Sequence, residues 1–109
     1  VLKRLIDLLL KENKLKIDLH QIYVDLGNNY YILEDYDNAF ITFQKALEIK
    51  NDSYVACFNL GNLLLTIGHK EDALTMFEWA YKINPKLNKA KEMIDNIKAG
   101  LKEKQDGKR

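Results

Sequence analysis

The stretch YVDLGNNY at residues 23–30 returns 34 residues later as CFNLGNLL at residues 57–64. The same shift of 34 matches further apolar positions, pairing Ala39 with Ala73, Phe43 with Phe77, Ala46 with Ala80 and Ile49 with Ile83. An internal repeat with a period of roughly 20 to 50 residues is typical of proteins whose units bury their apolar faces by stacking on one another. The sequence therefore predicts a stacked array.

Helices are predicted throughout, because apolar residues recur at spacings of three and four and the chain contains a single proline. The first repeated helix begins at Asp18 or His20 and ends near Leu33. The following helices are expected over residues 36–50, 54–67, 70–83 and about 86–104. Ser53 can cap the helix of residues 54–67, and Gly68 permits the reversal into the helix of residues 70–83. Pro85 is expected to start the segment that leads into the last helix.

The two ends of the chain differ from the repeated part. A narrow apolar stripe predicts a C-terminal capping helix over residues 88–104; its members are Leu87, Ala90, Ile94, Ile97 and Leu101. Residues 105–109 have no apolar content and are expected to form a disordered tail. Residues 1–12 contain six leucines and isoleucines. They fit either a third repeat that is cut short or a cap helix that also buries a second face.

The chain is thus expected to form one domain. Its parts are an N-terminal helix and linker (1–19), a first unit (20–53), a second unit (54–87), the capping helix (88–104) and the tail (105–109).

Composition excludes several classes of protein. No apolar run approaches the roughly 18 residues of a membrane span, so no membrane association is expected. The single cysteine, Cys57, rules out an internal disulfide, which favours an intracellular, cytoplasmic setting. Residues 20–85 carry four basic and nine acidic groups, between basic ends, and this charge pattern disfavours a nucleic-acid binder.

Catalytic and metal sites are not expected. His20 and His69 lie 49 residues apart without further ligands at metal-binding spacing, so both should face solvent or cap helices. Cys57 lies on an apolar face without a neighbouring base and reads as a small core residue. Asp35, Asp37, Glu71 and Asp72 fall in first turns of helices, where the helix dipole stabilises carboxylates. We therefore predict no enzyme activity and no cofactor.

The two copies of the repeat resemble the tetratricopeptide repeat (TPR). The first copy reads Tyr23-x-x-Leu26-Gly27-x-x-Tyr30 and continues with Ala39, Phe43 and Ala46. The second reads Cys57-x-x-Leu60-Gly61-x-x-Leu64 and continues with Ala73, Phe77, Ala80 and Pro85. Cys57, Glu34 and Asn51 depart from the family's usual aromatic, turn glycine and proline. The resemblance implies an all-α, right-handed α-solenoid of two TPR helix pairs with an N-terminal helix and a C-terminal capping helix.

Small residues have a structural role in this interpretation. Gly27 and Gly61 are expected where the two helices of a pair approach most closely, with Ala39 and Ala73 facing them. Bulk at these positions should overpack the core.

The resemblance also implies a function as a non-catalytic protein-interaction scaffold. In this family the first helix of each pair lines a concave groove that holds an extended peptide or a partner helix. Carried over to this chain, the groove residues are Gln21, Val24, Asp25, Asn28, Tyr31 and Ile32, followed by Val55, Phe58, Asn59, Asn62, Leu65 and Thr66. The asparagines can bond a peptide backbone through both donor and acceptor, and the apolar residues offer pockets.

Two alternatives concern the partner. TPR domains that clamp acidic chaperone tails use basic groups with two asparagines; here Asn28 and Asn59 match, but Val24 and Met93 occupy two of three basic positions and only Lys89 remains. A chaperone tail is therefore disfavoured. The alternative function is self-association, or assembly into a homo-oligomer, through the leucine-rich residues 1–12.

Overall fold

The computed structural model describes residues 2–11 and 18–106. These residues form six helices: α1 (Leu2–Lys11), α2 (Leu19–Ile32), α3 (Tyr36–Ile49), α4 (Tyr54–Thr66), α5 (Lys70–Ile83) and α6 (Asn88–Asp106). The two described ranges contain no strand, so the all-α prediction is confirmed. Within them, no helix combines the length and the apolar character that crossing a membrane requires.

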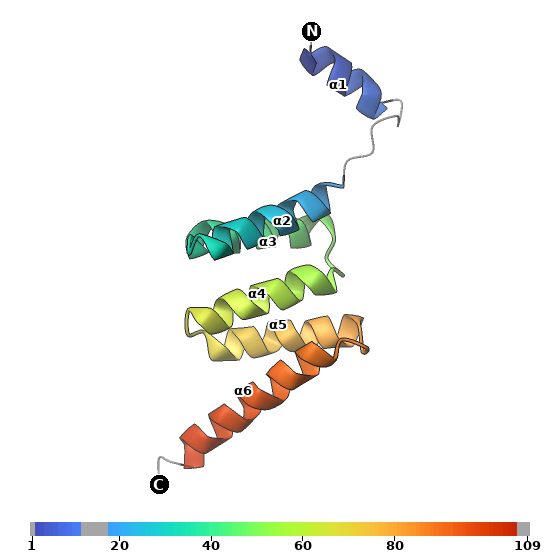
Figure 1. Cartoon of the computed structure of the whole chain (residues 1–109). Coiled ribbons are helices and arrows are strands. Elements are labelled where there is room, and N and C mark those ends of the chain that lie inside the picture. Colours follow the sequence, from blue (N-terminus) through green and yellow to red (C-terminus); the bar gives the residue numbers. More distant parts are fainter. Residues whose placement is uncertain (1, 12–17, 107–109) are drawn as a thin grey trace.

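Helices α2 to α6 stack in chain order (Figure 1). Helix α2 pairs with α3 and α4 with α5, while α3 packs on α4 and α6 runs along α5. The predicted solenoid of two helix pairs with a C-terminal capping helix is therefore confirmed.

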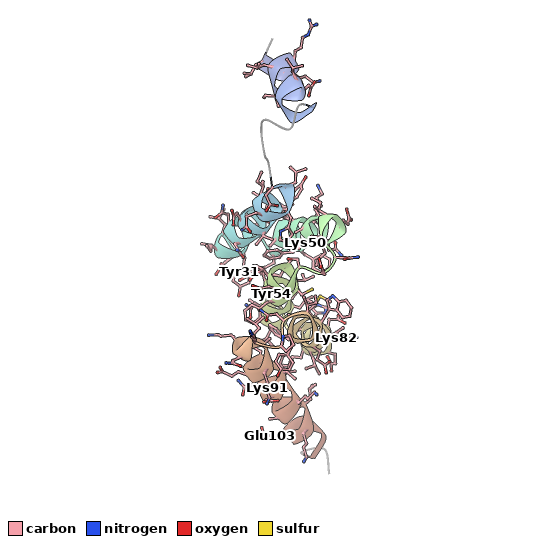
Figure 2. All side chains as sticks on the ribbon, turned by 90° about the vertical axis from the view of Figure 1, so that its right-hand side faces the viewer. Tyr31, Lys50, Tyr54, Lys82, Lys91 and Glu103 are labelled. Carbon is pink, nitrogen blue, oxygen red and sulfur yellow. The ribbon has the colours of Figure 1, made fainter. Side chains whose placement is uncertain are left out.

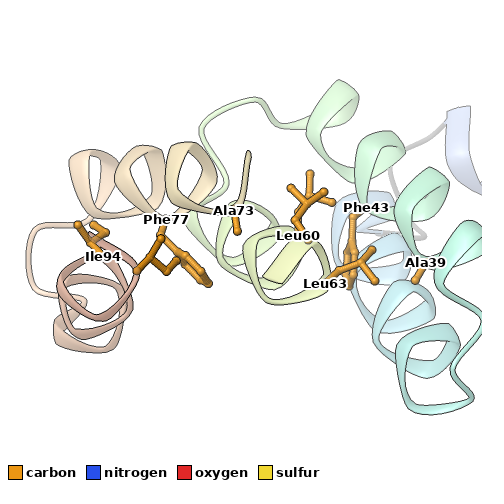
Figure 3. Close-up of a cluster of buried hydrophobic side chains, with 9 residues drawn as sticks. Ala39, Phe43, Leu60, Leu63, Ala73, Phe77 and Ile94 are labelled. Atoms are coloured by element: carbon orange, nitrogen blue, oxygen red, sulfur yellow. The ribbon is translucent and has the colours of Figure 1, made fainter. Parts of the chain in front are cut away.

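The apolar core is continuous along the stack of helices and is not gathered at one centre. Phe43 of the first unit and Phe77 of the second are fully buried, and both belong to one apolar cluster that continues into α6. Figure 3 shows this cluster as a row that passes from Ala39 and Phe43 through Leu60 and Leu63 to Phe77 and Ile94. The predicted structural residues Ala46, Ala73 and Ala80 are also buried. Burial of Ile94 and Ile97 shows why α6 caps the array: it covers the open side of α5.

The glycines at the helix crossings lie against aromatic rings. A Cβ built on Gly27 would be 2.5 Å from Cε1 of Phe43, and one on Gly61 would be 2.8 Å from Cε1 of Phe77. In both units the three atoms nearest to such a Cβ belong to the phenylalanine ring, a neighbour that the repeat pattern alone did not indicate. The glycines therefore make room for a ring rather than for a bare backbone contact.

The turns within both helix pairs use the same hydrogen bonds. The Asp35 N–H donates to the Tyr30 carbonyl at 2.9 Å, and 34 residues later the His69 N–H donates to the Leu64 carbonyl at 2.8 Å. This closing bond needs a left-handed residue just after the helix. Gly68 supplies it with φ of 91°, whereas the first unit places Glu34 there with φ of 62°.

Replacing Glu34 with glycine should stabilise the protein by about 0.5–1 kcal/mol. A side chain in the left-handed region costs about 1–2 kcal/mol, and the greater freedom of glycine in the unfolded chain offsets part of that gain. Urea unfolding followed by circular dichroism would measure the change. Gly68→Ala is the matched control and should be destabilising; a lower midpoint for Glu34→Gly would contradict the strain argument.

Helix α6 differs from its prediction at both ends. Pro85 lies in the turn after α5 rather than in the first turn of α6, which begins at Asn88. In this turn the Asn84 side chain accepts a hydrogen bond from the Lys86 N–H. The helix extends to Asp106, so residues 105 and 106 are not part of a disordered tail. Lysine, glutamate and glutamine are good helix formers, and none of the residues before 107 breaks the helix; residues 107–109 lie outside the described part.

Helix α1 lies apart from α2–α6 in both views of the molecule (Figures 1 and 2). Its apolar side chains Leu2, Leu5, Ile6 and Leu8 are exposed. The expectation of an N-terminal cap that buries a second face is therefore not met in this arrangement. The α1 helix neither covers the core nor fills the predicted groove.

Candidate functional site

The predicted groove residues lie on α2 and α4, the first helix of each pair. The Tyr31 hydroxyl and Thr66 Oγ1 are 2.7 Å apart, which joins the C-terminal ends of the two helices. Thr66 Oγ1 also donates to the Asn62 carbonyl at 2.8 Å. Because the threonine hydroxyl has one proton, Tyr31 must be the donor in the first bond. The Tyr31 ring is held further by a tilted contact with Tyr36, at 5.7 Å between centroids.

Three asparagines supply the polar part of this surface. Asn28, Asn59 and Asn62 are partly exposed, and their side-chain amides form no hydrogen bond with another described residue. Each amide can both donate and accept, as a peptide backbone requires of its partner. Asn28 and Asn62 stand one period of 34 apart, so the same chemistry recurs on neighbouring helices.

Only some of the apolar side chains on this surface are free to contact a ligand, because others also pack against the core. Phe58 packs edge-on against Phe77 with centroids 5.3 Å apart, and Leu65 also rests on the core cluster, so both residues support the fold as well as the surface. Val55 and Ile32 are exposed. Asp25 is exposed and accepts a hydrogen bond from Gln21 Nε2 at 2.9 Å.

Val24 does not line the groove. It is 1% exposed and packs with Ala46 and Ala56 in a small cluster between the two units. The resemblance to the TPR family predicts a groove position for Val24, because this residue matches a groove position of the family's motif. In this chain a β-branched apolar side chain at that position fills the space between units instead.

His20 is a structural residue whose partner the sequence did not reveal. Its Nε2 contacts Ser53 Oγ, and this same oxygen caps α4 by accepting from the Ala56 N–H at 3.1 Å. Asp18 caps α2 by accepting from the Gln21 N–H at 3.1 Å. His20 therefore ties the start of α2 to the start of α4. The 33-residue separation of His20 and Ser53 gave no local signal for this contact.

A second hollow of the surface lies away from α2. It has a volume of about 890 Å³ and opens between α3 and α5, the second helices of the pairs, with α4 as its floor. Its walls include Phe40, Ile41 and Met76, and Asp37 and Asp72 stand among its lining residues. Sequence reasoning missed this surface, because spacing along single helices does not show where helices of different units leave a hollow between them.

Cys57 and His69 are side chains that could carry out chemistry in other settings. Cys57 is 1% exposed, and burial raises the pKa of its thiol from 9.0 to about 11. At neutral pH it is a protonated, inaccessible thiol, which is the opposite of an activated nucleophile. His69 lies 3.9 Å from the Asp72 carboxylate on the exposed start of α5. Within residues 2–11 and 18–106, no cluster of three or more histidine, cysteine or acidic side chains could hold a metal ion.

These features define an α-helical repeat protein: two helix pairs with the same turn geometry, the same glycine–phenylalanine contact and a shared core. A model of the tetratricopeptide repeat matches residues 18–86, so the chain belongs to the tetratricopeptide repeat family. TPR domains are in general non-catalytic scaffolds for protein–protein interaction.

A solved structure agrees with this assignment at the level of the fold. It is the C-terminal TPR-containing domain of a protein from Plasmodium falciparum that is described as an FK506-binding protein. The TM-score is 0.69 at 23% sequence identity, over 81% of this chain. The match spans 58% of the length of that structure.

Proposed function

We propose that this protein is a protein-interaction scaffold that binds an extended peptide or a partner helix on the α2–α4 surface. The observation that carries the proposal is the set of side-chain amides of Asn28, Asn59 and Asn62, which have no hydrogen-bond partner among residues 2–11 and 18–106. These side chains are partly exposed on rigid helices, beside a tyrosine fixed by Thr66. A peptide backbone can pair with these donors and acceptors, and the Tyr31 side chain, already held by Thr66, loses little entropy when a ligand binds.

The apolar contacts of the ligand would be modest. Val55 and the accessible parts of Phe58 and Leu65 lie on the same helix as Asn59 and Asn62. The nearby Asp25 carboxylate is exposed, and the groove residues include no basic side chain. This balance favours a neutral or basic peptide over an acidic one, because a buried carboxylate on the ligand would lack a charged partner.

Removing two of the amides together should weaken peptide binding by about five- to 150-fold, since each lost hydrogen bond contributes about 0.5–1.5 kcal/mol. Peptides would be selected from a random library on the immobilised protein and their affinities measured by fluorescence anisotropy. The test variant is Asn28→Ala with Asn62→Ala. The control is Asn29→Ala with Asn96→Ala, which removes two exposed asparagines from other positions on the helices.

A further variant separates the two candidate surfaces. Ile41 is exposed on α3 and lines the hollow between α3 and α5, so Ile41→Lys should leave groove binding unchanged. If selected peptides lose affinity with Ile41→Lys but keep it with the double asparagine variant, the binding site is the hollow and the groove proposal is wrong.

The alternative function is self-association through the N-terminal helix. The exposure of Leu2, Leu5, Ile6 and Leu8 on α1 favours it, because exposed leucine-rich helices commonly find an apolar partner. Sedimentation velocity over a range of concentrations would show a dimer that Leu5→Glu abolishes. A chain that stays monomeric at all concentrations would exclude this function.

A further inference from the structure

One face of α2 is apolar and has no partner in this arrangement. Its three large side chains recur at spacings of three and four and are 53%, 50% and 38% exposed; they are Leu19, Ile22 and Leu26. The residues one period later on α4 are 3%, 0% and 5% exposed; they are Ser53, Ala56 and Leu60. The same helix face is thus covered in the second unit and uncovered in the first. We refer to Leu19, Ile22 and Leu26 as the α2 stripe.

In the second unit this face is covered by α3, the helix that precedes α4, and by α2: Ala56 packs with Ala46 of α3 and Val24 of α2, and Ser53 contacts His20 of α2. Phe40 of α3 and Leu60 of α4 belong to one packed cluster and line the same hollow. The helix that precedes α2 is α1. Helices α3 and α5 begin at Tyr36 and Lys70, one period of 34 residues apart, and the same step taken backwards from Tyr36 falls within α1 (Leu2–Lys11). By position in the repeat, α1 therefore corresponds to α3, and α2 corresponds to α4.

The α1 helix has the surface that this role requires. Leu2, Leu5 and Ile6 share one face, because they are separated by three and four residues, and all three are exposed. Shifted by one period, Ile6 corresponds to Phe40, and Leu26 corresponds to Leu60. The repeat register therefore predicts not only the two surfaces but also which side chains meet.

The connection is long enough for α1 to reach its own α2. Residues 50–53 suffice to join α3 to α4, whereas residues 12–18 lie between α1 and α2. Connections of two to eight residues are common between packed helices. A tethered helix also has an effective concentration in the millimolar range at its site, which favours docking within one chain over docking between copies.

We propose that α1 docks on the α2 stripe of its own chain and packs there as α3 packs on α4. Docking then covers the N-terminal end of the array. The docked α1 is the second helix of a further, partial unit. The α2 stripe lies at the N-terminal end of the solenoid, and docking of α1 there does not depend on peptide binding in the groove.

Cysteine cross-linking of the full chain tests the contact directly. In a Cys57→Ala background, Ile6→Cys is combined with Leu26→Cys, and the native protein is treated with a short bismaleimide at low micromolar concentration. The control combines Ile6→Cys with Ile41→Cys. Ile41 is exposed on α3 and does not belong to the α2 stripe. We expect an intramolecular link for the first pair and at least about fivefold less for the control, given the effective concentration of a docked helix.

Each other outcome overturns the proposal. Equal linking of both pairs would show a tethered helix without a fixed site. Linked dimers would show that α1 docks on a second copy, and absence of any link would show that α1 does not reach the stripe.

A stability measurement provides an independent readout. Ile22→Asp should raise the unfolding equilibrium constant about tenfold if α1 buries this side chain, and the effect should disappear in an Ile6→Asp background. Ile41→Asp, at a similarly exposed isoleucine, is the control and should change little. An equal effect of Ile22→Asp in both backgrounds would show that the stripe has no contact with α1 and would overturn the proposal.

Discussion

Gly27→Ala should lower the free energy of unfolding by about 1–2 kcal/mol, although alanine is the better helix former by about 1 kcal/mol. The reason is that the new Cβ would be 2.5 Å from Cε1 of Phe43, a ring that is 1% exposed and closely packed. Overpacking costs about 1–3 kcal/mol, and a contact this short belongs to the upper part of that range, about 2–3 kcal/mol, from which the gain in helix propensity is subtracted. A larger side chain such as leucine should cost more.

Gly100→Ala is the matched control and should have the opposite sign. Gly100 also lies inside a helix, but a Cβ there has no neighbouring atom within 4 Å. Only the gain in helix propensity remains, so the variant should be more stable by up to about 1 kcal/mol. Urea unfolding curves of both variants would give the two values.

A second substitution identifies the cause of the loss at Gly27. Phe43→Leu removes ring atoms beside the new methyl group, so Gly27→Ala should cost less in a Phe43→Leu chain than in the parent. If Gly27→Ala is as stable as the parent, or if its cost is unchanged in the Phe43→Leu chain, then the ring contact is not what requires glycine.

This pair of residues also shows how far the sequence could lead. The period of 34 located both glycines and both phenylalanines in the scaffold, because equal spacing implies equal position in stacked units. It could not tell which side chain faces the glycine, since Ala39 and Phe43 are one turn apart on the same face of α3. That choice depends on the tilt of the two helices, which single-sequence periodicity does not contain.

The candidate site was less predictable than the scaffold for a similar reason. Helical spacing put Val24 on the same side of α2 as Asn28, yet the structure buries Val24 and leaves Asn28 partly exposed. The boundary between groove and core is set by how closely α4 approaches α2. The contact between His20 and Ser53 and the hollow between α3 and α5 also arise only when helices from different units come together.

Phe43→Ala and Phe77→Ala should each cost about 3–5 kcal/mol, but they should unfold different parts of the chain. Both rings are fully buried, so the local loss is similar. Their positions in the stack differ. Phe43 belongs to the first unit, which has a neighbour on one side and an exposed α2 face on the other. Phe77 belongs to the second unit, which contacts α3 on one side and α6 on the other.

Stacked repeats are stabilised by each unit and by the contacts between nearest neighbours. Loss of the terminal first unit should therefore leave α4–α6 folded, whereas loss of the central second unit removes the support of both neighbours. Hydrogen exchange followed by mass spectrometry can distinguish these outcomes. In Phe43→Ala, protection should fall in residues 19–49 and persist in residues 54–101; in Phe77→Ala it should fall in all of them. The same uniform loss in both variants would mean that the two units and α6 unfold as one cooperative block, despite the linear arrangement of their contacts.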